Sequence, residues 1–180
     1  YAVIGHPSGH TLSPAINKAA FATLGETADY TAIPVPPGTL PGFVVGMRQS
    51  SLSGFNITMP HKQTVIPLLD ELTVDATRCA AVNTVARKNG RLWGHNTDLD
   101  GLQLALERAG SGYQGRRVLL LGAGGAARAV ALRAAESAEQ LYILGRLPQV
   151  AGAPARQVPA ALQTPGRCGP KTAPPSAQRP

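Results

Sequence analysis

The chain has 180 residues, of which 43% are hydrophobic and 15% charged. That is enough for one large domain or two small ones with an apolar core. No run of 18 or more apolar residues occurs, so we expect no membrane-spanning segment, and no secretion leader is evident. Cys79 and Cys168 form no Cys-x-x-Cys pair, which excludes a disulfide scaffold and a cysteine zinc site and favours the cytoplasm. The four histidines show no metal-ligand spacing, so we expect no metal site.

The net charge of +7 is unevenly distributed along the chain. Residues 1–146 hold 13 Lys and Arg against 10 Asp and Glu, a net charge of +3, whereas residues 147–180 hold 4 basic residues and no acidic one. The larger part of the chain is therefore only mildly basic, and no basic stripe with interleaved aromatic residues occurs. We expect no nucleic-acid partner.

Strands and helices alternate in the first half of the chain. The patterns predict strands at 1–4, 30–35 and 54–57, helices at 13–24, 40–48, 61–72 and 98–109, and a hairpin of strands 83–86 and 91–93. Ser13 is the expected N-cap of the first helix, followed by Pro14 in its first turn. Asn89-Gly90 is typical of a tight hairpin turn. Leu102 and Leu106 are expected on the inward face of the last of these helices.

A second pattern begins at residue 116. A predicted strand at 116–121 leads into Gly122-Ala-Gly-Gly-Ala-Ala127, a helix reaching about residue 139, and a strand at 141–144. This order is that of a βαβ unit. After residue 146 the pattern ends: residues 147–180 contain 8 prolines and no Phe, Tyr, Trp, Ile, Met or acidic residue. We expect this tail to be disordered.

The tail begins where a doubly wound domain would continue. Our hypothesis is that the body is truncated and the tail is translated in another reading frame. The alternative, a natural proline-rich extension, stays open.

The glycine turn favours a phosphate ligand. Without side chains, its backbone N–H groups can approach a pyrophosphate, and the N-terminus of the following helix adds positive potential. Gly122, Gly124 and Ala127 fit the Gly-x-Gly-x-x-Ala pattern of dinucleotide sites. At the end of the second strand Arg146 stands where NAD enzymes usually have an acid, which favours NADP. A tight turn without a ligand and a solvated arginine are the alternatives.

Polar residues near strand ends form three segments in the first half. They are 5–14, with Thr11 and Ser13; 56–62, with Asn56, Thr58 and Lys62; and Asn83-Thr84 followed by Asn96-Thr97-Asp98. In this order, and followed by the glycine turn, the segments resemble the shikimate dehydrogenase family over about residues 1–146. The resemblance implies an α/β fold in which an N-terminal three-layer α/β substrate domain is followed by a partial Rossmann-like NADP-binding domain. It places the shikimate-binding catalytic domain at 1–100, the partial nucleotide domain at 101–146 and the tail at 147–180.

The resemblance also implies roles for individual residues. Lys62 and Asp98 would be the catalytic pair, and substrate would be bound by Thr11, Ser13, Asn56, Thr58, Asn83 and Asp98. NADP would be bound by Gly122, Ala123, Gly124, Gly125, Ala126 and Arg146. The family usually has Ser at the position of Thr11, and Asn-Arg-Thr at the position of residues 145–147.

The implied activity is an oxidoreductase reaction, the NADPH-dependent reversible reduction of 3-dehydroshikimate to shikimate in aromatic amino acid (chorismate) biosynthesis. Lys62 is suited to move the proton and to stabilise negative charge on the substrate oxygen. Two alternatives stay open: a quinate/shikimate dehydrogenase, because of Thr11, and an inactive truncated remnant that at most binds ligand. The partner is then a small molecule, shikimate or 3-dehydroshikimate, and a homodimer is left open.

Overall fold

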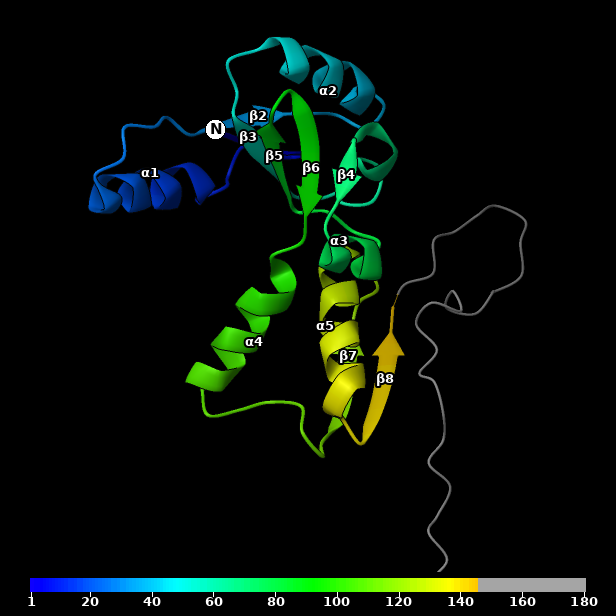
Figure 1. Ribbon diagram of the computed structural model, residues 1–180. Helices are drawn as coiled ribbons and strands as arrows, with labels where there is room; N and C mark the ends of the chain where they lie inside the picture. The colour runs from blue at the N-terminus through cyan, green and yellow to red at the C-terminus, as the bar shows by residue number, and fades with distance from the viewer. Residues whose placement is uncertain (146–180) are drawn as a thin grey trace, which may run out of the picture. The chain divides into compact units, whose positions relative to one another are not determined.

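The computed structural model describes residues 1–145 (Figure 1). The expected disorder of residues 147–180 and the expected role of Arg146 therefore lie outside the described residues. Within 1–145 the strands form two sheets, one of six strands and one of two. No helix of this part of the chain is long and apolar enough to cross a membrane.

The first 95 residues contain all six strands of the larger sheet and the helices between them. In chain order these elements are β1 (Ala2–Gly5), α1 (Ser13–Leu24), β2 (Thr31–Pro34), α2 (Leu40–Gln49), β3 (Gly54–Ile57), the short 3₁₀ helix η1 (Ile66–Leu68), β4 (Glu71–Leu72), α3 (Val74–Cys79), β5 (Thr84–Lys88) and β6 (Arg91–His95). The strand order is β2-β1-β3-β5-β6-β4. β1 runs parallel to both β2 and β3, whereas β5 is antiparallel to β3 and β6.

The two faces of this sheet meet different helices. Ala2 and Ile4 are fully buried in a core that includes Val44 of α2. Val3, between them, lines a cavity together with Ser13 of α1. Because successive side chains of a strand point to opposite faces, α2 and α1 flank opposite faces of the sheet. The expected three-layer α/β arrangement is confirmed.

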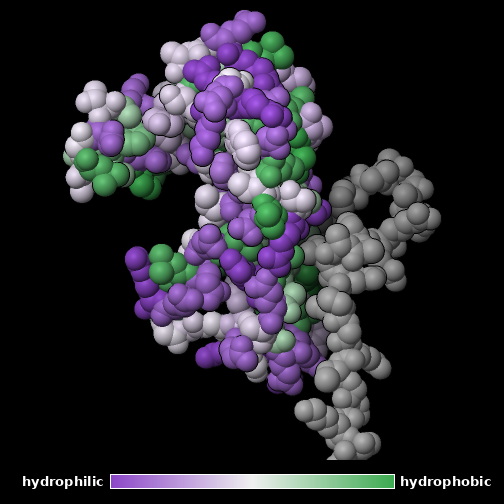
Figure 2. Space-filling view, viewed as in Figure 1, coloured by the Kyte–Doolittle hydropathy of each residue, from purple (hydrophilic) through white to green (hydrophobic). Residues whose placement is uncertain are grey.

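Helix α1 is more loosely covered than α2. Three residues of α2 are buried, but α1 has none. Leu12, Ile16 and Leu24 at α1 are 64–73% exposed, and Figure 2 shows apolar side chains on the surface of this helix. The sheet face next to α1 is therefore the more accessible one.

The two-stranded sheet belongs to the predicted βαβ unit. After α4 (Asp98–Arg108), strand β7 (Arg117–Leu121) is joined through α5 (Gly125–Ser137) to the parallel strand β8 (Gln140–Leu144). The buried residues of α5 are Ala129, Ala131 and Ala134. Their small side chains let neighbouring elements lie close to the helix.

Helices α3, α4 and α5 meet where the two sheets adjoin. Their shared apolar cluster consists of Cys79, Ala81, Leu99, Ala129 and Leu132. Ion pairs from α5 reach both other helices: Glu136 pairs with Arg78 at 2.7 Å and Arg133 with Asp100 at 2.9 Å. Helix α5 is thus fixed to α3 and α4 by apolar and ionic contacts together.

Two of the sequence predictions for helices are wrong. The expected helix at 61–72 is a series of turns, followed by η1 and β4. Pro67 cannot continue a helix because its ring clashes with the carbonyl one turn back. The carbonyl of Lys62 instead accepts a hydrogen bond from the Val82 N–H at 2.7 Å. The segment therefore pairs with residues about 20 positions later in the chain rather than with itself.

Ser13 is also not the N-cap of α1. The helix begins at Ser13 itself, and Leu12 occupies the cap position without a side-chain hydrogen bond. In α4 the buried residue is Leu99, whereas the expected Leu102 and Leu106 are half-buried. Helix α3 was not predicted, although Thr73 caps it by accepting from the Ala76 N–H.

Candidate active site

A cavity of about 290 Å³ lies at the N-terminus of α1. Thr11, Ser13 and Thr58, three of the expected substrate residues, line it. The Thr11 hydroxyl donates to Ser13 Oγ at 3.0 Å and accepts from the Ser13 backbone N–H at 3.2 Å. Ser13 is free for this arrangement because it is not the helix cap. A helix N-terminus with two hydroxyls is suited to an anionic ligand such as a carboxylate.

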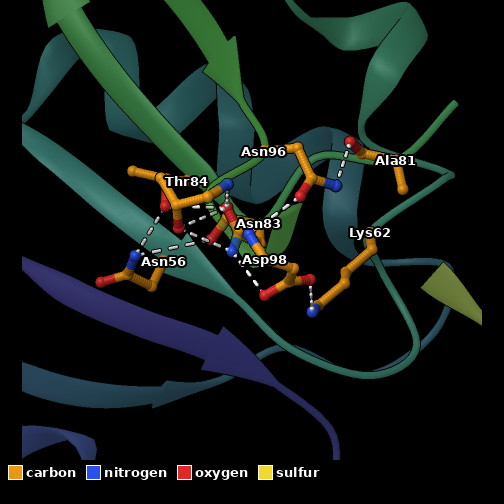
Figure 3. Close-up of polar contacts among 8 residues, drawn as sticks. Asn56, Lys62, Ala81, Asn83, Thr84, Asn96 and Asp98 are labelled. Carbon is orange, nitrogen blue, oxygen red and sulfur yellow. Dashed lines mark hydrogen bonds and ion pairs between the residues drawn. The ribbon is translucent and has the colours of Figure 1, made fainter. Parts of the chain in front are cut away.

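The lysine and the aspartate that the sequence singles out form an ion pair. Lys62 Nζ lies 2.7 Å from Asp98 Oδ2, and the two side chains are 19% and 28% exposed. Figure 3 shows them pointing toward each other from separate segments of the chain. The pair is partly shielded from water, which strengthens the attraction between the charges.

The second oxygen of Asp98 is held by an asparagine network. Asn83 donates from Nδ2 to Asp98 Oδ1 at 2.8 Å, while Asn83 Oδ1 accepts from the Thr97 N–H at 3.0 Å. Asn96, which is 5% exposed, accepts from the Asp98 N–H at 3.0 Å and donates to the Ala81 carbonyl at 2.9 Å. Asn83 therefore fixes the orientation of the Asp98 carboxylate, and Asn96 fixes the backbone from which it extends (Figure 3).

Asn56 lies further along the same network. Its Oδ1 accepts from the Tyr30 hydroxyl at 2.6 Å, and its Nδ2 donates to Thr84 Oγ1 at 2.9 Å. Burial raises the pKa of Tyr30, which keeps its hydroxyl a donor. With both ends of the amide bonded to protein, Asn56 supports strands β3 and β5 rather than lining either cavity described here.

A larger cleft of about 530 Å³ lies between the segment carrying Lys62 and the start of α5. Its lining residues are Thr58, Met59, Pro60, Lys62, Gln63, Thr64, Gly124, Gly125, Ala126 and Ala127. Thr58 lines both this cleft and the smaller cavity. Thr58 therefore separates the cavity that holds the α1 hydroxyls from the cleft that holds the lysine and the glycine turn.

The glycine turn has the backbone that its sequence predicts. Gly122 has φ +121°, a value that favours glycine, and α5 begins at Gly125 with Gly124 at the cap position. The first N–H groups of a helix have no acceptor within it, so they can bind an anion. Gly124, Gly125 and Ala126 line the cleft, but Gly122 and Ala123 are not among its lining residues.

Several residues of the site escaped the sequence analysis. Ser8 lines the smaller cavity, is 5% exposed, and its hydroxyl has no hydrogen-bond partner among the described residues. Met59 and Gln63 line the cleft. Their proximity to the predicted residues in sequence was the only available signal. Tyr30 gave none, because its contact with Asn56 depends on strand pairing.

Comparison with known proteins identifies relatives that match most of this chain. Residues 3–85 match the family described as the shikimate dehydrogenase substrate binding domain. The chain is 46% identical to the NADP(+) shikimate dehydrogenase of Thermococcus kodakarensis over 85% of its length and 56% of the relative's. For the enzyme of the same name from Desulfitobacterium hafniense the identity is 42%, over 83% of this chain and 55% of the relative. The chain spans about half the length of these curated relatives.

A solved structure shows the same arrangement of elements. The shikimate 5-dehydrogenase of Thermus thermophilus, in complex with NADP(H) and shikimate, is 41% identical and superimposes with a TM-score of 0.74. The match covers 82% of this chain and 56% of that one. The family resemblance and the fold class expected from the sequence are both confirmed.

Proposed function

We propose that this chain, which belongs to the shikimate dehydrogenase family by sequence and fold, serves the NADPH-dependent reversible reduction of 3-dehydroshikimate to shikimate. The observation that carries the proposal is the Lys62–Asp98 pair, with Lys62 lining a cleft that reaches the glycine turn and shares Thr58 with the cavity at the hydroxyl-rich N-terminus of α1. The two cavities together offer a cation, an anion-binding helix end and a dinucleotide turn, which a carbonyl reduction requires.

The substrate is proposed to bind with its carboxylate at the N-terminus of α1. Thr11 and Ser13 would donate to it, because their hydroxyls line that cavity. Thr58 would meet the ring, since it lines both cavities. Asn83 would exchange its Nδ2 contact with the exposed Thr97 hydroxyl for a ring hydroxyl, and Asn56 would act through the network that holds Asn83 and Thr84.

Lys62 is proposed to transfer the proton. Its ammonium donates to the substrate oxygen during reduction and accepts the proton back during oxidation, while its charge stabilises negative charge on that oxygen. Asp98 orients Nζ through the 2.7 Å contact. Asn83 holds the other carboxylate oxygen, and Asn96 holds the Asp98 backbone N–H.

The described residues fit a dinucleotide pyrophosphate. The cleft reaches Gly124, Gly125 and Ala126 at the start of α5, where unpaired N–H groups and open space above Gly124 meet. Gly122 and Ala123 would support the turn. Bound NADPH would supply the hydride, and we propose Arg146 as the partner of its 2′-phosphate.

The domain division and cellular setting are also proposals. We assign residues 1–100 to substrate binding and 101–146 to the nucleotide domain. A cytoplasmic site of action is supported by Cys79, a buried free thiol. A homodimer is compatible with the helix α1 surface and awaits a measurement of molecular mass in solution.

The test is turnover by the 180-residue chain. Purified protein is mixed with shikimate and NADP+, and absorbance of the reduced nicotinamide is followed, with quinate and NAD+ as parallel arms. We expect Lys62→Met to lower the rate by about 10²- to 10⁴-fold, the usual contribution of a proton-transferring group. The matched control is Lys88→Met, an exposed lysine on the hairpin, with an unchanged rate.

Other outcomes separate the alternatives. Faster turnover of quinate than of shikimate would identify a quinate/shikimate dehydrogenase. No turnover in any arm, together with shikimate binding by calorimetry, would identify a ligand-binding remnant. Neither turnover nor binding from folded protein would refute the proposal.

A further inference from the structure

The second glycine of the Gly124-Gly125 pair has no role in the dinucleotide pattern. In Gly-x-Gly-x-x-Ala the patterned positions are 122, 124 and 127, so position 125 accepts any residue. Gly125 also has no left-handed backbone, because it is not among the glycines with positive φ. Neither the pattern nor the backbone conformation therefore explains why glycine stands there.

Space explains it. A Cβ atom placed on Gly125 would lie 3.0 Å from both Cβ and Cδ of Lys62 and 3.5 Å from its Cγ. Non-bonded carbon atoms prefer about 3.5–4.0 Å, so an added methyl group would overlap the lysine stem. At Gly124 the same construction meets no atom within 4 Å. The restriction is specific to position 125.

The lysine stem cannot easily move aside. At its outer end Nζ is held by Asp98 at 2.7 Å, and at its base the Lys62 carbonyl accepts from the Val82 N–H at 2.7 Å. Displacing the stem would lengthen one of these contacts. The ammonium would then lose the position set by Asp98.

Helix α5 is equally constrained. Ala129 packs with Cys79 and Leu99 in the cluster that joins α3, α4 and α5, and Arg133 pairs with Asp100 at 2.9 Å. Moving the start of α5 away from Lys62 would disturb this junction. A side chain at position 125 can therefore be accommodated only by disrupting contacts of Lys62 or of α5.

We infer that Gly125 is a positioning residue for Lys62. Its missing side chain lets the lysine stem lie against the first turn of α5, so that the glycine turn and the Lys62–Asp98 pair keep one fixed spacing. The packing follows from the contacts alone. Its meaning, a set distance between the bound dinucleotide and the proton-transferring ammonium, rests on the proposed function.

The test is a mutant cycle on the 180-residue chain, followed by thermal unfolding with the fluorescence of Trp93. The effect of Gly125→Ala is measured in three backgrounds: the unaltered chain with Lys62, the Lys62→Ala variant and the Lys62→Gly variant. With Lys62 present we expect the melting temperature to fall by about 3–8 °C, as for an overpacked site. The fall should shrink with Lys62→Ala, which removes Cγ and Cδ, and vanish with Lys62→Gly, which removes Cβ as well.

The control is Gly101→Ala in α4, where an added Cβ meets nothing within 4 Å; it should lower the melting temperature in none of the three backgrounds. If Gly125→Ala does not fold beside Lys62, folding of the double variant with Lys62→Gly supports the inference. An equal fall in all three backgrounds, or failure to fold in all three, overturns it.

A binding measurement separates positioning from direct contact with the ligand. In NADP+ titrations we expect Gly125→Ala to weaken binding by about tenfold, the equivalent of 1.4 kcal/mol, and Lys62→Gly to restore it. Weakening that persists with Lys62→Gly would mean that Gly125 serves the pyrophosphate directly and would overturn the positioning role. Absence of NADP+ binding by the unaltered chain would refute the proposed cofactor, while the unfolding cycle still decides the packing.

Discussion

The two sheets of this protein are stabilised very differently. In the six-stranded sheet the central residues Ile4 and Leu92 are completely buried. In the two-stranded sheet Leu119, Leu121, Tyr142 and Leu144 are 54–71% exposed, while the alternate residues face α5. A sheet with helices on both faces can build a core by itself. A single βαβ unit covers only one of its faces, so half of its apolar side chains meet water.

The candidate site includes residues from both the first region, which holds the six-stranded sheet (residues 1–95), and the second region, which is the βαβ unit (residues 117–144). Every polar residue of the Lys62–Asp98–Asn83 network belongs to the first region or to the start of α4. The glycine turn belongs to the second and reaches the network through the docking of α5 on α3 and α4. Stability of the first region and docking of the second are therefore separate requirements for the proposed function.

The largest expected effect is a truncation in the six-stranded core. Leu92→Ala removes a completely buried side chain from β6 and should lower the free energy of unfolding by about 3 kcal/mol, through lost transfer energy and the cavity left behind. Urea denaturation with unchanged slope would measure it. A loss below about 1 kcal/mol would contradict the assignment of the main core to this sheet.

The junction between the regions is expected to protect a thiol. Cys79 is 1% exposed, and burial, followed by the nearby Asp75 and Asp98, raises its pKa to about 11. In a Cys168→Ser background, an aromatic disulfide reagent at pH 8 should react with the folded chain about 100-fold more slowly than with the unfolded chain, because the thiolate is the reactive form. The rate should rise as the pH approaches 11. Rapid reaction in native buffer would show that α5 undocks while the six-stranded sheet remains folded.

A smaller effect is expected from an acid in the first region. The Arg48 guanidinium, and then the Leu92 N–H, lower the pKa of Asp70. The carboxylate therefore stabilises the fold above the pKa of the unfolded chain, about 3.9, and this contribution is lost as the pH falls through the lower folded value.

We expect Asp70→Asn to flatten the dependence of the melting temperature on pH below about 4, relative to the unaltered chain. The matched control is Asp29→Asn, whose partner Lys18 forms a far more exposed pair, with Asp29 81% exposed; solvent screening should leave its slope nearly unchanged. Equal slopes for all three proteins would exclude Asp70 as a contributor.

The smallest effect should come from the uncovered sheet face. Leu121→Ala changes a side chain that is 71% exposed and should alter the free energy of unfolding by less than about 0.5 kcal/mol. Set beside Leu92→Ala under the same conditions, it measures the contrast between the sheets directly. A loss of more than about 2 kcal/mol would indicate that this face is covered in solution.

Local patterns were sufficient for the elements with strong short-range signals. The Asn89-Gly90 turn was predicted from its residues, and both have positive φ. The βαβ unit was predicted from a strand, a glycine turn and a helix in succession, and β7, α5 and β8 follow that order. The helix expected at 61–72 was wrong because its pairing with residues 82 and 92 lies far away in sequence and leaves no periodic signal.

The sequence by itself determined which residues are candidates for the proposed chemistry: the lysine, the aspartate, the hydroxyls and the glycine turn were each singled out from residue type and order. Only the tertiary structure decided how they are held. Asn83 Nδ2 donates to Asp98 Oδ1, and the Tyr30 hydroxyl donates to Asn56 Oδ1. Gly125 leaves room for the side chain of Lys62. These contacts join residues 15 to 63 positions apart in the chain, and they depend on strand order and helix docking, which are set by the burial of the whole core rather than by any local pattern.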